Sequence, residues 1–284
     1  MHTFPQKLFS PKNGCLTIIL TIGLHLFCFG QTDTVFTNNE KIACSVKEIT
    51  PEAVKYTYPG EDVINSIYKN TVQKIIFKSG RVQTFAEATS YKVVANVMDF
   101  DKVTITAVES EVRGLYKLGD VSSKAKGTTT FSNQERVKER AYRKFKIQAA
   151  MLGANVILLT NQRTEGNKYG YYNSSTAETN LTGIAYSSVL PDLEKFKKLI
   201  GTKTDLVVVR EYKLWASDSD VSQDDDARAF KINNIVNNNG IIYIDASLQG
   251  ERDVHQFQLA GFNDDNFNVQ YKAGSTDYNL MISF

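Results

Sequence analysis

The sequence predicts an α+β protein built from three small modules: an N-terminal β-barrel, a central α+β sandwich with one helix, and a β-rich C-terminal domain. Two observations carry this prediction. Short stretches of alternating apolar and polar residues, separated by turn-forming residues, fill residues 31–89 and 205–284 and are typical of strands. Between them, residues 132–152 have the apolar spacing of one amphipathic helix, and a strand-like apolar run follows at once. About 250 residues are enough for two or three such cores.

The first 30 residues have the layout of a secretory signal peptide. Lys7 and Lys12 precede an apolar stretch over 16–29, and the small residues Cys28 and Gly30 occupy the two positions that a signal peptidase reads. The apolar stretch is shorter than the about 20 residues that a membrane span needs. We therefore expect cleavage after Gly30 and export of a chain without a transmembrane span to the periplasm or the cell surface.

The positions of the three cysteines bear on how the leader is processed and on whether the mature chain can form a disulfide. The alternative is a lipoprotein acylated at Cys28 and associated with the outer membrane, although Phe27 stands where a small residue is expected. Cleavage leaves Cys44 as the only cysteine, so an intramolecular disulfide is excluded. Cys44 alternates with Ile42 and Val46 along an expected strand, which predicts that it packs as a small hydrophobic residue.

Charge is balanced overall but divided along the chain. The sequence has 33 basic and 31 acidic side chains, and the leader contributes two of the lysines. Residues 31–204 carry 25 basic and 18 acidic groups, whereas residues 205–284 carry 6 and 13. This division is compatible with two parts that dock on each other, with two parts that meet different partners, and with two solvated faces. An exported chain without net positive charge does not favour nucleic acid as a partner.

The N-terminal module, residues 31–89, is expected to contain only strands. Alternating stretches at 41–50, 53–58, 72–77 and 81–85 are joined by short turns, and Ser79-Gly80 marks a hairpin. This pattern suits a small SH3-like or Sm-like barrel. Tyr56, Tyr58 and Tyr68 are expected to be half-buried in its packing, with a binding groove as the alternative.

The same segment resembles a short N-terminal module of exported bacterial proteins of unknown function. The residues that carry the resemblance are the Glu-Lys-Ile start at 40–42, Val-Lys-Glu-Ile-Thr at 46–50, the Tyr-rich strand, and Lys-Ile-Ile-Phe-Lys-Ser-Gly-Arg at 74–81. The resemblance covers about 55 residues. It implies a barrel that binds a peptide or packs on a neighbouring domain, and it brings no catalytic motif.

The central module, residues 90–190, is expected to have the order β, β, α, β, β. Ser132 and Glu135 have the spacing of a capping box, which predicts that the helix begins there and ends at Gly153. Its core face is predicted from the spacing of Val137, Ala141, Phe145, Ala149 and Leu152. Strands are expected at 103–108, 112–118, 156–159 and 181–187, with polar loops over 122–130 and 164–179.

The helix-to-strand junction at 148–157 resembles a family of small bacterial envelope domains. Its sequence, Gln-Ala-Ala-Met-Leu-Gly-Ala-Asn-Val-Ile, is similar to that of the Rcs stress-sensor lipoprotein and of the related YbjQ-like fold, once labelled as heavy-metal binding. The resemblance implies a helix laid across a small sheet. The disulfides of the sensor and the ligands of a metal site do not transfer, because residues 90–190 contain neither Cys nor His.

The outward face of the predicted helix is basic. It carries Arg136, Arg140, Arg143 and Lys144, with Glu139 spaced for an ion pair to Arg143. These four basic residues are the candidate partner- or lipid-binding residues. Anionic lipid headgroups, the acidic face of a partner and the acidic C-terminal part of the same chain all fit such a face, and a solvated face remains an alternative.

Residues 191–204 are expected to form a linker with a short helix that ends at Gly201. The C-terminal domain, residues 205–284, is expected to be a β-sandwich or small barrel, with strands at 206–215, 230–236, 241–248, 254–260, 267–271 and 278–284. The acidic segment Asp218–Asp226 is expected to be a loop. Closely spaced carboxylates suit calcium, but the segment lacks the central Gly and the closing Glu of an EF-hand.

Signs of an enzyme are missing from the sequence. After the leader the chain has one histidine, His255, which is expected at the surface, and it has no nucleophile elbow, phosphate loop or dinucleotide fingerprint. We therefore expect no cofactor and a secreted, non-catalytic envelope protein that binds a protein or a surface component. The alternative function is an envelope stress sensor that reads anionic lipid or glycan through the basic helix.

Overall fold

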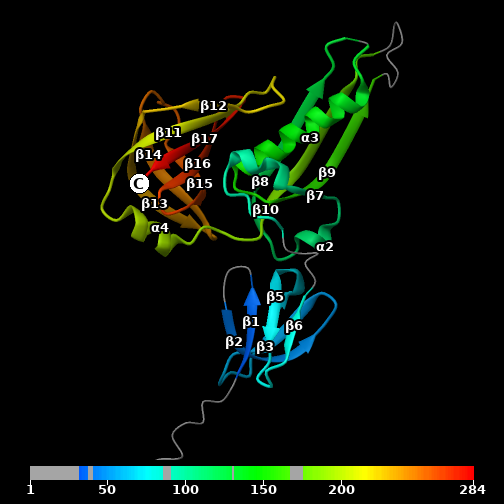
Figure 1. The fold of residues 1–284 in the computed structure, drawn as a ribbon, viewed down its shortest axis with the longest axis vertical. Helices are drawn as coiled ribbons and strands as arrows, with labels where there is room; N and C mark the ends of the chain where they lie inside the picture. Colours follow the sequence, from blue (N-terminus) through cyan, green and yellow to red (C-terminus); the bar gives the residue numbers. More distant parts are fainter. Residues whose placement is uncertain (1–31, 38–40, 86–90, 130, 167–174) are drawn as a thin grey trace, which may run out of the picture.

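A computed structural model describes residues 32–37, 41–85, 91–129, 131–166 and 175–284. The predicted leader therefore lies outside the described residues. The strands form three sheets, one in each predicted module, and the C-terminal unit lies beside the central one (Figure 1). The chain is β-rich with few helices, as expected. None of the helices in the described ranges is long and apolar enough to cross a membrane.

The N-terminal module is a six-stranded antiparallel sheet with the order β4-β3-β2-β1-β5-β6. Among the described residues no pairing joins β4 to β6, so the sheet is not the closed barrel that the strand pattern predicted. Cys44 is fully buried with Val35 and Val54, as predicted, whereas Tyr58 and Tyr68 are exposed. The strands are β1 (Asp33–Thr37), β2 (Lys41–Ile49), β3 (Ala53–Thr57), β4 (Asn65–Tyr68), β5 (Val72–Ile76) and β6 (Val82–Thr84).

The central module is a four-stranded sheet with one long helix across it. The strands and this helix follow the predicted order, but a short helix, α2, precedes the second strand, which begins at Tyr116 rather than at 112. The strand order is β7-β9-β10-β8, in which β7 is parallel to β9 and the other pairs are antiparallel. The polar segment 122–126 is not the start of a loop but the end of β8, because β10 pairs with it along its length. The elements are β7 (Thr104–Thr106), α2 (Glu109–Val112), β8 (Tyr116–Lys126), α3 (Gln134–Met151), β9 (Val156–Glu165) and β10 (Glu178–Ser187).

Helix α3 begins one residue later than a capping box at Ser132 predicts. Asn133 is the N-cap, and its side-chain oxygen accepts hydrogen bonds from the backbone N–H groups of Glu135 and Arg136. Ser132 instead accepts a hydrogen bond from the N–H of Thr129. The predicted core face is confirmed. Four of its residues are buried and Leu152 is partly buried; the buried four are Val137, Ala141, Phe145 and Ala149.

The C-terminal unit is a single seven-stranded sheet rather than the two sheets of a sandwich. Its pairings run from β11 through β13, β14, β15, β16 and β17 back to β11, so six strands form a closed circuit. The strands are β11 (Asp205–Leu214), β12 (Ser222–Asp225), β13 (Ala229–Asn238), β14 (Ile241–Leu248), β15 (Gln256–Phe262), β16 (Asn266–Ala273) and β17 (Thr276–Ser283).

Residues 191–204 do more than link two modules. Helix α4 (Leu193–Ile200) ends at Gly201 as predicted, and Asp192 is its N-cap. However, Phe196 is fully buried and packs against Phe262 and Phe267, so α4 belongs to the core of the C-terminal unit. The apolar side of this helix therefore folds with the sheet that follows it.

The N-terminal module meets the central one through exposed polar contacts. The side-chain amide of Asn70 donates to the carbonyl oxygens of Glu111 and Arg113. The guanidinium of Arg113 pairs with Glu52 at 3.1 Å, and both side chains are exposed. Contacts of this kind contribute little stability each, because solvent screens them.

Candidate functional site

The basic face of α3 is divided between solvent and the C-terminal unit. Lys144 is only 4% exposed, and its ammonium donates to the carbonyl oxygens of Trp215 at 3.0 Å and Ala216 at 2.6 Å. Burial lowers the pKa of Lys144, although Asp277 and Asp218 oppose that shift. Lys144 is therefore not accessible to a lipid headgroup.

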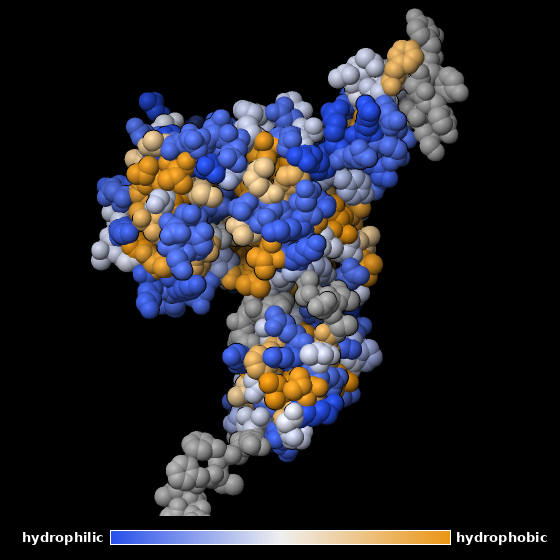
Figure 2. All heavy atoms as spheres, in the orientation of Figure 1, coloured by the Kyte–Doolittle hydropathy of each residue, from blue (hydrophilic) through white to orange (hydrophobic). Residues whose placement is uncertain are grey.

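The other three candidate residues lie nearer the surface. Arg143 pairs with Asp220 of the C-terminal unit at 3.0 Å, not with Glu139. Arg140 is partly exposed and donates to the carbonyl of Lys126, and Arg136 is exposed. Figure 2 shows hydrophilic residues gathered over the end of the central module where α3 begins. The basic N-terminal part and the acidic C-terminal part could dock on each other, meet different partners or be solvated. The contacts of Arg143 and Lys144 with the C-terminal unit agree with docking of the two parts on each other.

A second stripe of α3, not predicted from the sequence, faces the C-terminal sheet. Lys144, Gln148 and Met151 are spaced at i, i+4 and i+7, so they lie on one side of the helix. The Gln148 amide donates to the carboxylate of Asp277 at 2.8 Å. The fully buried Asn279 amide donates to the carbonyl of Met151 at 2.8 Å. These contacts place the end of α3 firmly against β17.

The turn that ends α3 lies against β15. Gly153 has a φ of +77°, and a Cβ on it would lie 2.1 Å from the carbonyl oxygen of Ala260. Glycine is required here both for its backbone conformation and for the close approach of two main chains. The junction that suggested an envelope-domain fold therefore also joins the two modules.

The acidic segment is used for ion pairs with arginines. Residues Ser222–Asp225 are strand β12, paired with β11, so part of the expected loop is a strand. Asp220 pairs with Arg143, and Asp225 pairs with Arg210. In the described ranges no group of three or more His, Cys, Asp or Glu side chains is arranged to hold a metal ion. The calcium hypothesis gains no support from this geometry.

A partly buried ionic cluster surrounds Arg228 in the C-terminal unit. Its guanidinium pairs with Glu211 at 2.6 Å and with Asp226 at 2.7 Å, and Glu211 also pairs with Lys213 at 2.6 Å. Burial alone would raise the pKa of Asp226, but hydrogen bonds from Arg228 outweigh it and the pKa is lowered. Charges that satisfy each other in this way are typical of a structural cluster. His255 is exposed, as predicted, and lies one residue before β15.

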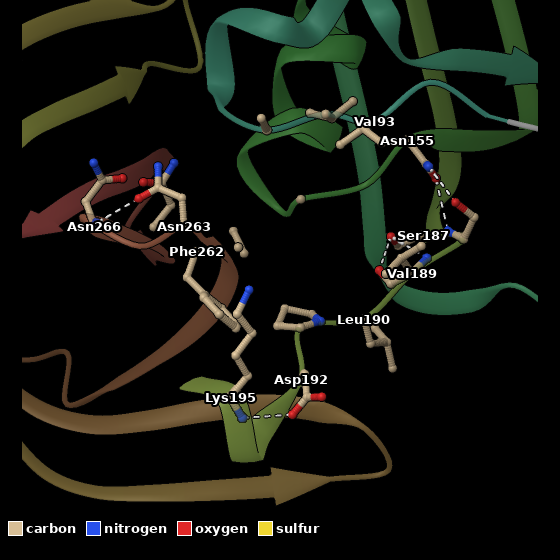
Figure 3. A pocket seen from close by; sticks show the side chains of 18 residues that line it. Val93, Asn155, Ser187, Val189, Leu190, Asp192, Lys195, Phe262, Asn263 and Asn266 are labelled. Atoms are coloured by element: carbon tan, nitrogen blue, oxygen red, sulfur yellow. Dashed lines mark hydrogen bonds between the residues drawn. The ribbon is translucent and has the colours of Figure 1, made fainter. Parts of the chain in front are cut away.

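A cleft of about 390 Å³ opens between the central and C-terminal units (Figure 3). This volume lies in the range of small-ligand and peptide-side-chain sites. One wall comes from residues 93–95, a second from residues 187–192 with Lys195 of α4, and a third from the end of β15 and the start of β16. Gly153 and Asn155 complete the lining at the helix-to-strand junction. The two closely packed modules therefore enclose a site that neither could form alone.

The lining combines an exposed apolar rim with uncharged polar groups. Val93 and Val189 on the rim are 73% and 45% exposed, and Leu190 and Pro191 continue the apolar wall. The polar groups include three asparagines of the β15–β16 hairpin: Asn263, Asn266 and Asn268. Asp192 and Lys195 are the charged residues of the lining, so its formal charge is zero.

Gly261 leaves open space in the wall of this cleft. A Cβ at this position would meet no heavy atom within 4 Å, and its φ does not lie in the left-handed range. A larger side chain would therefore enter the cleft without backbone strain.

Sequence reasoning did not find this cleft, because its walls come from segments far apart in the chain. The only local indication of the cleft was the apolar run Val189-Leu190-Pro191, just before the N-cap of α4. Unless the facing β15–β16 hairpin is known, such a run indicates only a segment that packs in a core. Comparison with known proteins adds no assignment: no family model matches the chain, and no curated protein or solved structure matches it.

Proposed function

We propose that this chain is an exported, non-catalytic envelope protein that binds a protein or surface component in the cleft between its central and C-terminal units. The observation that carries the proposal is the cleft itself, with its exposed apolar rim and uncharged polar wall. Exposed apolar side chains beside a concave surface are typical of interaction sites. The signal-peptide pattern of residues 1–30 supports export.

The experiment is a capture from an envelope extract with residues 31–284 as bait, at low and at high salt, followed by mass spectrometry. The blocking variant is Gly261→Leu, which fills the cleft from a position that has free space. The matched control is Ser247→Leu, which adds the same side chain at an exposed position of β14.

We expect a component that is captured by the parent chain and by Ser247→Leu at both salt concentrations and is lost with Gly261→Leu. Retention by an uncharged, partly apolar cleft is expected to persist at high salt, because salt screens charge interactions only. A component captured equally by all three chains would contradict the cleft as its site. Turnover of a substrate that is lost on mutation of one acidic residue would contradict the non-catalytic proposal.

The alternative proposal is a stress sensor that reads anionic lipid or glycan through α3. The observation in its favour is that Arg136 is exposed and Arg140 partly so. It predicts salt-sensitive binding to anionic liposomes that is lost in the double variant Arg136→Glu and Arg140→Glu. Binding that survives this charge reversal would remove the alternative.

A further inference from the structure

Strands β14 and β15 separate beside the cleft. They pair at Gln256–Gln258 of β15, and this register would continue by placing Ile242 and Ile241 opposite Leu259 and Ala260. No strand pairing is formed at those positions. Leu190 lies at this gap, because one of its methyl carbons is 2.7 Å from where a Cβ of Gly240 would be. The last residues of β15 therefore have a strand partner on one side only, which is β16.

The free side of β15 presents main-chain hydrogen-bonding groups at Phe262. The N–H of Asn263 donates to the carbonyl of Asn266 at 2.9 Å, and Phe262 pairs with Phe267 as the next position of the hairpin. Because hydrogen-bonded and non-hydrogen-bonded pairs alternate in an antiparallel ladder, the N–H and C=O of Phe262 point away from β16. Phe262 also lines the cleft, across from Leu190 (Figure 3).

We infer that the cleft binds a short extended peptide segment of a partner protein, which adds to the free side of β15 at Phe262. This inference rests on the proposed function and names the class of its ligand. Addition of a strand to an open sheet position is a common way to bind peptides, in which the main chain supplies affinity and side-chain contacts supply specificity.

The lining indicates what the peptide carries. Its apolar side chains would contact the exposed Val93 and Val189 on the rim and the partly buried Leu190 beside them. Among the asparagine side chains opposite, the oxygen of Asn263 already accepts from the N–H groups of Asp265 and Asn266, so its amide NH₂ is the group left to donate to a peptide carbonyl. Because the charged residues of the lining balance each other, an uncharged segment is the complementary one.

The test selects random short peptides from a phage-displayed library on immobilised residues 31–284, with Gly261→Leu as the counter-selection. The selected peptides are then synthesised, and each amide in turn is N-methylated, which removes one main-chain donor. We expect uncharged, apolar-containing peptides whose affinity falls at least tenfold with Gly261→Leu and is unchanged with Ser247→Leu. We also expect N-methylation at one or two positions to weaken binding about tenfold, while neighbouring positions tolerate it.

A second variant, Val189→Asp, keeps the test informative if Gly261→Leu destabilises the fold. Val189 is 45% exposed, so a carboxylate is tolerated there, and we expect it to weaken the selected peptides by at least tenfold. Peptides that bind all variants equally, or that tolerate N-methylation at every position, would overturn strand addition. A selection that yields no cleft-dependent peptide would also overturn it, even if the capture experiment still finds a Gly261-dependent component; in that case the proposed function would stand and the peptide class would fail.

Discussion

Replacing Gly153 with alanine tests the contact on which the arrangement of the two larger units depends. The residue ends α3 with a φ of +77°, and the added Cβ would lie 2.1 Å from the carbonyl oxygen of Ala260. A side chain can turn away from such a clash, but a main-chain carbonyl within a strand cannot. Either the end of α3 or β15 must therefore move.

The expected loss has two parts. A Cβ in the left-handed conformation costs about 1–2 kcal/mol. Forcing an extra methyl group into a packed contact costs about 1–3 kcal/mol more. We therefore expect the free energy of unfolding to fall by roughly 2–5 kcal/mol, well beyond the effect of an ordinary surface glycine.

The measurement is urea unfolding followed by the fluorescence of Trp215, the only tryptophan. Its backbone carbonyl accepts a hydrogen bond from Lys144, so the residue lies at the contact between the units. The control is Gly250→Ala, because Gly250 has a φ of +86° with nothing within 4 Å of an added Cβ, and it reports the backbone cost alone. If Gly153→Ala costs no more than Gly250→Ala, the close packing of α3 on β15 is refuted.

Three further predictions concern single side chains. Lys144→Met is expected to destabilise the fold by about 1–3 kcal/mol, because two carbonyl oxygens lose their charged donor. Burial lowers the pKa of Lys144, so on raising the pH this side chain loses its proton in the folded state before it does so in the unfolded state. The free energy of unfolding of the parent chain, relative to that of Lys144→Met, should therefore rise as the pH approaches 10.5, the pKa of lysine in the unfolded chain. Thiol reagents at pH 8 should label Cys44 only after unfolding, as mass spectrometry would show, because burial and then Asp33 raise its pKa to about 11. Arg143→Ala should cost under about 1 kcal/mol in the same urea assay, because its pair with Asp220 is exposed.

Elements with a strong period were predictable from the sequence. The core face of α3, the strand that follows Gly153, and the helix that ends at Gly201 all appear where the spacing placed them. The spacing of apolar residues indicates which face of an element is buried, and burial of apolar surface is the dominant favourable contribution to folding. It does not report which module provides the burial, so α4 was interpreted as a linker although Phe196 is in a core.

Predictions based on composition alone were less accurate. The acidic residues around Asp224 favour a loop, yet β11 pairs with this segment and Arg210 forms an ion pair with Asp225. The segment around Ser123 was taken for a loop because it is polar, yet it forms part of β8, and the Ser123 hydroxyl donates to the carbonyl of Ala141. Strand pairing depends on a partner far away in the sequence, so polarity alone is a weak guide to it.

The candidate site was the least predictable part. The basic residues of α3 were visible in the sequence, but the burial of Lys144 depends on carbonyl oxygens about 70 residues away, at Trp215 and Ala216. The walls of the cleft come from residues 93–95, 187–192 and 260–268, which no local pattern brings together. One lining residue that the sequence marked was Gly153, as the end of a helix. Its close approach to the carbonyl of Ala260 could not be predicted, because Ala260 is far away in the sequence.

Stability and binding should therefore be coupled through this contact. Gly153 and Ala260 both line the cleft, so a ligand that binds there stabilises the folded state in which the two units pack together. A selected peptide at 100 times its dissociation constant should raise the free energy of unfolding by about 2.7 kcal/mol in the parent chain. It should give almost no increase in Gly261→Leu, whose cleft is filled. In Gly153→Ala the increase should be smaller than in the parent chain, because the displaced wall weakens the peptide. An equal increase in all three chains would mean that the peptide binds elsewhere.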